Sequence, residues 1–291
     1  MHLSLDCIPC IVNSLLRLLQ NGLVPDDKKQ EAMRQLLGFL ARTDYTQSPP
    51  AIGREMHRMI RTILEDPDPY QEIKKQSNEK MLGLYEEFKQ RVKDSPNPLN
   101  TVMRLAIAGN VIDFGPQNQL DLIETIEKVM HATLAIDDSQ SLATELKAAE
   151  SVLYIGDNCG EIVLDKLFIE TLNHPHLTFV VRSGPTINDA TLEDAQTIEL
   201  GKLARVMTTG DDSPGAVWEF TSDEFKQEVS NADVVIAKGQ GNLEGLLDID
   251  KSIYFLLTVK CPVIGNRIGA QTGDFILYQK PDRSNVKVRE T

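Results

Sequence analysis

The stretch Ser151-Val-Leu-Tyr-Ile-Gly-Asp-Asn-Cys-Gly160 predicts the fold of this chain. Val152–Ile155 is a short apolar run that suits a buried strand, and a glycine interrupts it. Over Glu161–Leu172, apolar residues return at helical spacing. A strand, a tight turn and a helix are the repeating unit of open parallel α/β sheets, in which ligands bind at the carboxyl ends of the strands. We therefore expect Asp157 and Asn158 where such a fold carries out its chemistry.

A carboxylate and an amide oxygen side by side are hard ligands, which suit Mg²⁺ or a similar cation. The competing interpretation is helix capping, because Asp and Asn are favoured N-cap residues. Asp157 and Asn158 alone do not separate the two. The loops that follow the other strands favour the metal.

The rest of the chain alternates strands with helices from residue 151 onward. This pattern predicts a mainly parallel sheet covered by helices on both faces, hence an α/β fold. Strands are expected at 152–155, 178–182, 205–208, 233–238, 253–258 and 262–264, and helices at 160–172, 191–197, 215–230 and within 242–252.

Residues 1–95 carry helical patterns and predict an all-helical lobe. Its expected helices are 10–19, one beginning at Pro25, 51–64 and a long, charged, solvent-facing helix over 73–92. The linker Ser95-Pro-Asn-Pro98 separates this lobe from a predicted metal-binding catalytic domain, 96–291. A helical segment, 98–150, leads into that domain.

Charge is distributed unevenly over the 291 residues, whose net charge is −13. Residues 1–95 hold 14 Lys or Arg and 14 Asp or Glu, so the whole excess lies in residues 96–291, with 16 against 29. Nucleic acid is not expected as a partner, because binding a phosphate backbone needs a basic face. An acidic domain that handles an anionic substrate would need a bound cation to offset its field.

The first apolar run is interrupted by polar residues within about a dozen positions. It therefore predicts neither a membrane-spanning helix nor a signal peptide. We expect a cytoplasmic protein. Cys7 and Cys10 form a CxxC pair without the two further ligands that a zinc site needs. Buried thiols in a reducing compartment are the preferred interpretation of the cysteines. The oligomeric state stays open.

Two further strand ends carry polar, glycine-containing loops. In the first, Asn188-Asp189 can supply a second carboxylate to a cation held by Asp157 and Asn158, although an N-cap is again the alternative. In the second, Lys238-Gly239-Gln240-Gly241-Asn242, the glycines allow backbone N–H groups to approach an anion and the lysine adds a charge. The Walker A pattern is absent.

The segment Gly109-Asn110-Val-Ile-Asp113 places two polar residues among apolar ones. Buried polar groups need partners. A helix C-cap and a role beside the ligand remain equally open for Asn110 and Asp113.

Phosphate-ester hydrolysis fits these loops, with a metal that polarises the phosphoryl oxygen and activates a water, and with Lys238 and backbone amides neutralising charge. A non-catalytic sensor of a metal and a phosphorylated metabolite could use the same residues. An S-adenosylmethionine-dependent carboxyl methyltransferase is a third option, but no GxGxxG fingerprint supports it.

The set of motifs resembles the damage-control phosphatase family, formerly a domain of unknown function, over nearly the whole chain. The resemblance rests on Cys7-x-x-Cys10, Asp68-Pro-Tyr70, Gly109-Asn110-x-x-Asp113, Gly156-Asp157-Asn158-x-Gly160-Glu161, Asn188-Asp189 and Lys238-Gly239-Gln240-Gly241-Asn242. It points to the stand-alone microbial branch.

This resemblance implies a helical lobe packed on a three-layer α/β/α, Rossmann-like domain that acts on small phosphorylated metabolites, such as sugar phosphates or damaged cofactor-related phosphates. It implies a divalent metal, with Mg²⁺ or Mn²⁺ expected and Co²⁺ or Ni²⁺ possible, held by Asp157, Asn158 and Asp189. Lys238 is expected near the substrate phosphate. The expected neighbours of the substrate are Asn110, Asp113, Glu161, Arg182, Gly239, Gly241 and Asn242.

Overall fold

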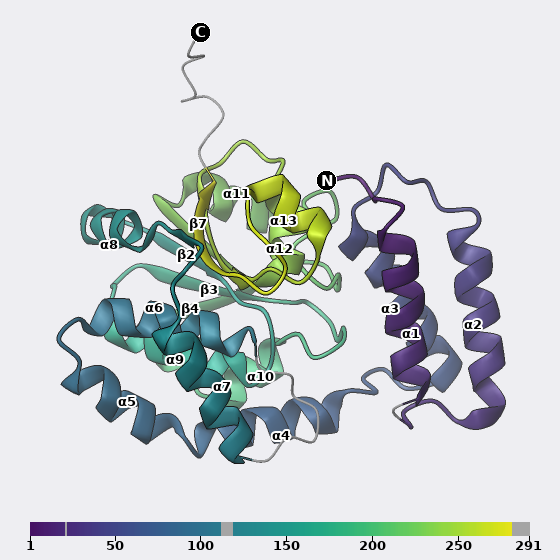
Figure 1. The fold of residues 1–291 in the computed structure, drawn as a ribbon, viewed down its shortest axis with the longest axis horizontal. Coiled ribbons are helices and arrows are strands. Elements are labelled where there is room, and N and C mark those ends of the chain that lie inside the picture. Colours follow the sequence, from purple (N-terminus) through teal and green to yellow (C-terminus); the bar gives the residue numbers. More distant parts are fainter. Residues whose placement is uncertain (21, 112–118, 281–291) are drawn as a thin grey trace, which may run out of the picture.

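The computed structural model describes residues 1–20, 22–111 and 119–280. Its first half is helical (Figure 1). The helices before the first long strand are α1 (Cys7–Gln20), α2 (Asp26–Leu40), α3 (Pro49–Leu64), α4 (Gln71–Leu82), α5 (Tyr85–Asp94), α6 (Pro98–Gly109), α7 (Gln119–His131) and α8 (Ser139–Ala148).

A seven-stranded sheet forms the centre of the second half, in the order β1-β7-β6-β5-β2-β3-β4. Its strands are β1 (Ile136–Asp137), β2 (Val152–Ile155), β3 (Leu177–Val181), β4 (Arg205–Thr208), β5 (Val234–Lys238), β6 (Ile253–Thr258) and β7 (Phe275–Lys280). Every neighbouring pair is parallel except β6 and β7. The helices between strands are α9 (Glu161–Leu172), α10 (Leu192–Thr197), the 3₁₀ turn η1 (Leu200–Lys202), α11 (Asp223–Asn231), α12 (Gly239–Leu246) and α13 (Pro262–Ile268).

The strand order places a topological switch point between β2 and β5. From β2 the chain moves outward through β3 and β4, then returns to the other side of β2 and moves outward through β5 and β6. Loops that leave the carboxyl ends of two such strands diverge to opposite faces, and the crevice between them is where ligands bind in this class of sheet. The loops after β2 and β5 therefore define the expected site.

Two apolar cores lie on the two faces of the sheet, which gives three layers (Figure 1). Every residue of β2 and of β5 is buried. A central parallel strand is covered on both faces, so it needs a continuous apolar run. On one face α6 and α9 pack against residues such as Tyr154 and Ile236. On the other face α11, α12 and α13 supply residues such as Phe225, Leu243 and Ile264.

The N-terminal helices have a third core of their own, formed by residues of α1, α2 and α3 together with Tyr70. Helices α4 and α5 instead contribute Met81, Phe88 and Val92 to the core beneath the sheet. The apolar cores thus separate near residue 70, whereas the linker suggested a boundary at residue 95. Because α4 packs with the core beneath the sheet and not with the N-terminal helices, it lies close to the expected site.

Several predicted elements need correction. Pro262–Ile264 is the start of α13 and not a strand, because a proline at the first helical position lacks only an N–H that the helix does not use. The predicted helix 73–92 is two helices, α4 and α5, separated at Gly83 and the buried Leu84. Helix α11 begins only at Asp223, where the Ser222 hydroxyl caps it. Strands β1 and β7 were not predicted.

None of the helices in the described part of the chain combines the length and the apolar character needed to cross a bilayer.

Candidate metal and phosphate site

The loops after β2 and β3 are joined by backbone hydrogen bonds. Asn158 and Asp189 form an antiparallel bridge. The Ala190 N–H donates to the Asp157 carbonyl at 2.8 Å, and the Cys159 N–H donates to the Asn188 carbonyl at 2.8 Å. Residues about thirty positions apart in the sequence therefore lie side by side at the carboxyl edge of the sheet.

Arg182, which directly follows β3, brings the two predicted carboxylates together. Its Nε donates to Asp189 Oδ2 at 2.7 Å, and its Nη2 donates to Asp157 Oδ1 at 3.3 Å. The side chain is 1% exposed, and its Nη1 has no hydrogen-bond partner among the described residues. A buried guanidinium donor without a partner is suited to an anionic oxygen that arrives with a ligand.

The second oxygen of Asp157 receives two amide groups. Asn158 Nδ2 donates to Asp157 Oδ2 at 2.8 Å, and Asn110 Nδ2 donates to it at 3.1 Å. Asn110 is fixed in turn by the Thr258 N–H, which donates to its Oδ1 at 3.2 Å. Asn110 is both the C-cap residue of α6 and a neighbour of the site. The amide oxygen of Asn158, the atom expected to bind the cation, takes no part in its bond to Asp157.

Gly239 leaves room for the Asp157 carboxylate. A Cβ at this position would lie 1.9 Å from Asp157 Oδ2, and the backbone has a φ of +76°. Any side chain would collide with the carboxylate, and the conformation itself favours glycine. Gly239 thus lets the chain after β5 pass close to the Asp157 carboxylate, whereas the approach of its N–H group to a substrate anion stays a prediction.

Lys238 is buried behind Asp157 and Asn158, next to Glu161. Its ammonium donates to Glu161 Oε1 at 2.6 Å and to Asp165 Oδ1 at 2.8 Å, and it is 0% exposed. Tyr154 Oη donates to the same Asp165 oxygen at 2.7 Å. The other oxygen of Glu161 accepts from Asn158 Nδ2 at 3.0 Å. Lys238 therefore acts on the site through Glu161, which it holds in place beside Asn158.

Burial shifts the pKa values of these groups. Desolvation raises the pKa of Asp157, and the charges of Asp189 and Glu161 add to this, against the opposing effect of Arg182. Desolvation also raises the pKa of Asp189, despite the Arg182 guanidinium beside it. Both carboxylates are thus harder to ionise than carboxylates in water, and added positive charge would favour their ionised forms.

The charges around the site do not balance. Four carboxylates, those of Asp157, Glu161, Asp165 and Asp189, are at most 8% exposed, and so are the two cations Arg182 and Lys238. When all six are ionised, the sum is two negative charges. We call these six residues the buried charge cluster. Burying excess charge is costly unless a counterion offsets it, and one divalent cation offsets this excess completely.

Within the described residues, no three His, Cys, Asp or Glu side chains are arranged so that they could hold a metal ion. The predicted ligand set contains two carboxylates and one amide, so three acidic or imidazole ligands are not required of it. With water in the remaining positions, two carboxylates and an amide match the oxygen-rich, open coordination of Mg²⁺ and Mn²⁺.

The other residues that were predicted to contact the substrate after β5, Gly241 and Asn242, contact neighbouring segments of the protein itself. Asn242 Nδ2 donates to the carbonyls of Gly156 and Lys238, and its Oδ1 accepts from the Ala216 N–H. A Cβ at Gly241 would lie 2.5 Å from the Pro214 carbonyl oxygen. Both residues therefore hold neighbouring loops together. Asp113 lies outside the described residues.

Lys260 is a cation near the site that the sequence analysis missed. It follows β6, its side chain is exposed, and its charge lowers the pKa of both Asp157 and Asp189. Its backbone N–H donates to Gln240 Oε1 at 2.8 Å. Its position just after an apolar strand could have indicated it, since Lys238 was predicted as a site residue from the same kind of position.

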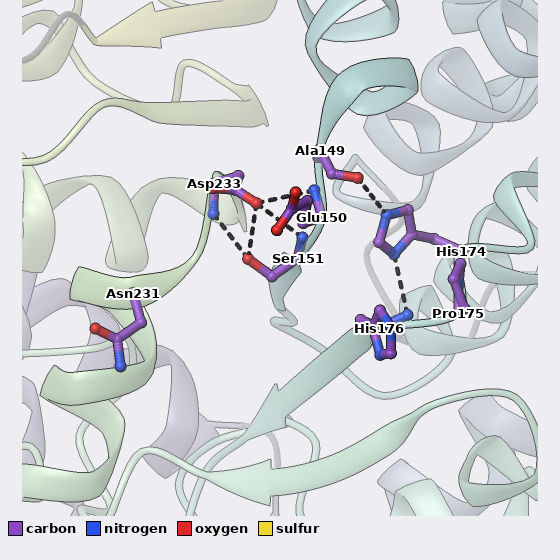
Figure 2. Close-up of a pocket in the computed structure, with 8 residues that line it drawn as sticks. All are labelled: Ala149, Glu150, Ser151, His174, Pro175, His176, Asn231 and Asp233. Atoms are coloured by element: carbon purple, nitrogen blue, oxygen red, sulfur yellow. Dashed lines mark hydrogen bonds between the residues drawn. The ribbon is translucent and has the colours of Figure 1, made fainter.

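A cavity of about 520 Å³ lies at the opposite edge of the sheet (Figure 2). It is lined by the segments that precede β2, β3 and β5. Its polar groups are largely used between these segments: Asp233 Oδ2 accepts from the N–H groups of Glu150 and Ser151, and His174 Nε2 lies 3.0 Å from the Ala149 carbonyl. The amino ends of parallel strands are not where this class of sheet binds its ligands.

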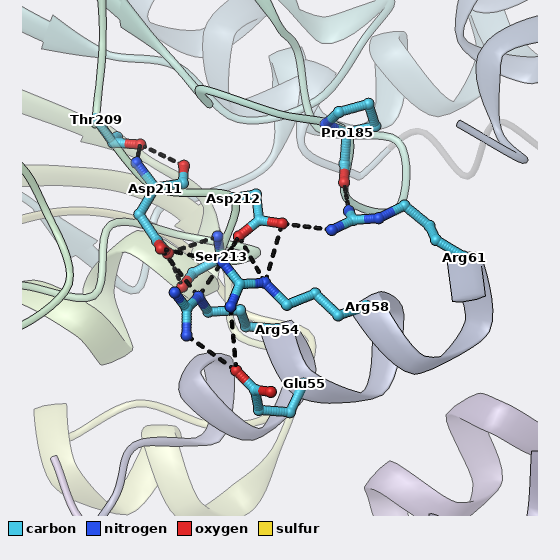
Figure 3. Close-up of polar contacts among 9 residues, drawn as sticks. All are labelled: Arg54, Glu55, Arg58, Arg61, Pro185, Thr209, Asp211, Asp212 and Ser213. Atoms are coloured by element: carbon cyan, nitrogen blue, oxygen red, sulfur yellow. Dashed lines mark hydrogen bonds and ion pairs between the residues drawn. The ribbon is translucent and has the colours of Figure 1, made fainter. Parts of the chain in front are cut away.

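A second group of charges joins α3 to the loop after β4 (Figure 3). Arg58 Nη2 donates to Asp212 Oδ1 at 2.6 Å, and Arg54 Nε lies 2.9 Å from Asp211 Oδ2. Arg61 pairs with Asp212 and also donates to the Pro185 carbonyl. We call this set, with Glu55, the α3 arginine cluster.

Comparisons with known proteins agree along nearly the whole chain. Residues 3–276 match the damage-control phosphatase ARMT1-like domain. A damage-control phosphatase of Pyrococcus horikoshii is 35% identical, over 95% of this chain and 97% of its own. One of Archaeoglobus fulgidus is 31% identical, over 95% and 98%. The crystal structure of a DUF89 family protein from Pyrococcus horikoshii superposes with a TM-score of 0.89 at 33% identity, covering 97% of this chain and 100% of that one.

Proposed function

Because this chain belongs to the damage-control phosphatase ARMT1-like family, we propose that it is a divalent-metal-dependent phosphatase that hydrolyses small phosphorylated metabolites. The excess of two negative charges in the buried charge cluster carries the proposal. The excess lies at the switch point of the sheet, where a ligand is expected. Sugar phosphates and damaged, cofactor-related phosphates are the proposed substrates.

The residues that would hold the cation are Asp157, Asn158 and Asp189, with Mg²⁺ or Mn²⁺ preferred by their oxygen ligands and Co²⁺ or Ni²⁺ also accepted. Such a cation supplies polarisation of a phosphoryl oxygen and activation of an attacking water. Asn110 orients Asp157 through its bond to Oδ2. Glu161 orients Asn158, and Lys238 holds Glu161 in turn.

The substrate phosphate would be recognised by positive groups that are still available. Arg182 offers its unpartnered Nη1 from beside both carboxylates. Lys260 offers an exposed ammonium whose field reaches the same two acids. Both would oppose the charge that develops on the phosphoryl oxygens during displacement. We therefore propose that Lys260, and not the buried Lys238, is the lysine whose charge attracts the substrate phosphate.

Phosphate release from a panel of sugar phosphates tests this function. The protein is stripped with a chelator and then supplied with Mg²⁺, Mn²⁺, Co²⁺ or Ni²⁺. We expect turnover with at least one metal and none without metal. Asp157→Asn is the inactive variant, and Asp212→Asn is its matched control, since the same change is made in the α3 arginine cluster. If release by the wild type does not exceed that by Asp157→Asn under any metal, the chain is not this phosphatase.

A further inference from the structure

Helix α4 buries a polar face. Its sequence is charged, yet Lys74, Ser77 and Asn78 are only 3%, 4% and 1% exposed. These residues follow the core boundary near residue 70 and face the loops of the α/β region. Burying an amide is costly unless both its donor and its acceptor find partners.

Asn78 finds one partner in the loop that carries Asp157 and Asn158. Its Oδ1 accepts a hydrogen bond from the Gly160 N–H at 2.6 Å. Gly160 has a φ of +76° and is the N-cap residue of α9, so this N–H lies at the end of the turn from which Asp157 and Asn158 project. The Asn78 side chain thus fixes the end of that turn.

Its other partner belongs to the loop that carries Asp189. Asn78 Nδ2 donates to Asp194 Oδ1 at 3.2 Å. The other oxygen of Asp194 accepts from the N–H of Thr191 at 2.9 Å and from its hydroxyl at 2.8 Å, which closes a capping box at the start of α10. Thr191 stands two residues after Asp189. The negative charge of Asp194 is offset by Lys74 Nζ, 3.4 Å away.

We propose that Asn78 is a positioning residue for the metal site, which sets the separation between the loop of Asp157 and Asn158 and the loop of Asp189. The inference rests on the proposed metal-dependent function. An amide of this length meets both requirements, because it accepts from Gly160 and donates to Asp194 at the same time. Aspartate would only accept, and alanine would do neither. Groups that orient metal ligands commonly change metal affinity by about 10- to 100-fold when removed.

Mn²⁺ binding to the substrate-free protein tests this role, with free Mn²⁺ measured from its paramagnetic resonance signal. We expect Asn78→Asp and Asn78→Ala to weaken binding at least about tenfold. Ser77→Ala is the matched control, because the Ser77 hydroxyl is buried in the same helix but donates to the Ile73 carbonyl. Ser77→Ala should bind Mn²⁺ within about twofold of the wild type, because the hydrogen bond that it removes lies within α4 and contacts neither site loop.

A kinetic measurement separates positioning from general destabilisation. With Mn²⁺ raised until each variant is saturated, kcat should recover most of its wild-type value while KM for the sugar phosphate stays unchanged. Thr191→Val loosens the link at its other end without altering α4, and it should weaken Mn²⁺ binding about threefold through the lost hydroxyl bond.

Two results would overturn the inference. If a folded Asn78→Asp protein, checked by circular dichroism, binds Mn²⁺ as tightly as the wild type, Asn78 does not position the site. Should the Asn78 variants not fold, wild-type Mn²⁺ affinity in Thr191→Val has the same consequence. A wild-type protein that binds none of Mn²⁺, Co²⁺ and Ni²⁺, nor Mg²⁺ by calorimetry, would instead refute the proposed function.

Discussion

The buried charge cluster and the α3 arginine cluster both lie at the carboxyl edge of the sheet, and both pair arginine or lysine with carboxylates. The α3 arginine cluster is balanced, with Arg54, Arg58 and Arg61 against Glu55, Asp211 and Asp212. It is also partly open to solvent, since the Arg58 side chain is 40% exposed. The buried charge cluster has two carboxylates too many and almost no exposure.

This difference distinguishes a structural role for the α3 arginine cluster from the ligand-binding role that we propose for the buried charge cluster. Balanced charges at a partly solvent-exposed contact satisfy one another and fix how two elements meet. Unbalanced charges that are buried reduce the stability of the fold, so they indicate a missing partner of opposite charge. The comparison predicts that equivalent substitutions in the two clusters differ in the size or the direction of their effects.

The largest expected effect is on activity. Asp157→Asn should reduce kcat/KM about ten-thousandfold, because Asp157 is a proposed metal ligand and the metal would supply several kcal/mol of transition-state stabilisation. Without metal the same variant should unfold at an equal or higher temperature than the wild type, since it loses an excess buried charge. Phosphate release and a thermal scan measure the two effects. A variant that is both active and less stable would contradict the comparison.

Next in size is the loss of the buried ammonium. Lys238→Met should reduce the free energy of unfolding by about 3–5 kcal/mol, because it leaves Glu161 and Asp165 without their cation. Urea unfolding checks this value. Adding Glu161→Gln and Asp165→Asn should recover most of the loss. Arg58→Met, the corresponding change in the α3 arginine cluster, should cost at most about 1 kcal/mol.

Metal addition should stabilise the wild type by about 2.7 kcal/mol when Mn²⁺ is present at one hundred times its dissociation constant. The gain arises because the ion binds the folded state alone. Thermal scans with Mn²⁺ and with a chelator measure it. Asp212→Asn should show the same gain, whereas Asp157→Asn should show none. Equal gains in both variants would place the ion elsewhere.

The smallest expected effect is on the stability of the fold at acid pH. Burial opposes ionisation of Asp212, but hydrogen bonds from Arg58 and Arg61 outweigh it and lower its pKa to about 2. A depressed folded-state pKa stabilises the protein above the unfolded value near 4, and this contribution disappears as the pH falls toward 2. After solvent screening we expect about 1 kcal/mol. The stability difference between wild type and Asp212→Asn in urea should be present at pH 5 and shrink toward pH 2; a constant difference would contradict it.

The sequence predicted the central part of the sheet well. Strands β2 and β5 are buried on both faces, so their apolar runs are continuous and flanked by glycine. Strand β7 was not predicted, although residues 275–278 form an apolar run; the strand ends in the polar Gln279 and Lys280 and pairs antiparallel with β6 near the edge of the sheet. Short apolar runs such as Pro262–Ile264 fit both a strand and a helix, and only their packing distinguishes them.

Side-chain direction limited the prediction of the site. The acids after β2 and β3 follow from strand order alone, since parallel strands bring their ends together. The direction of Lys238 depends on Asp165, four residues inside α9, and no local pattern in the sequence reports that pairing. Asn78 lies in a helix whose composition suggests a solvated surface. Its burial depends on the way α4 joins the core beneath the sheet.

The space at Gly239 has a consequence for reading other sequences of this family. The first carbon of any side chain there would occupy the place of an Asp157 oxygen. A relative with a larger residue at the matching position must have rebuilt its β2 loop or given up that carboxylate. Position 239 therefore offers a simple marker for members whose chemistry has diverged, readable before any of them is purified.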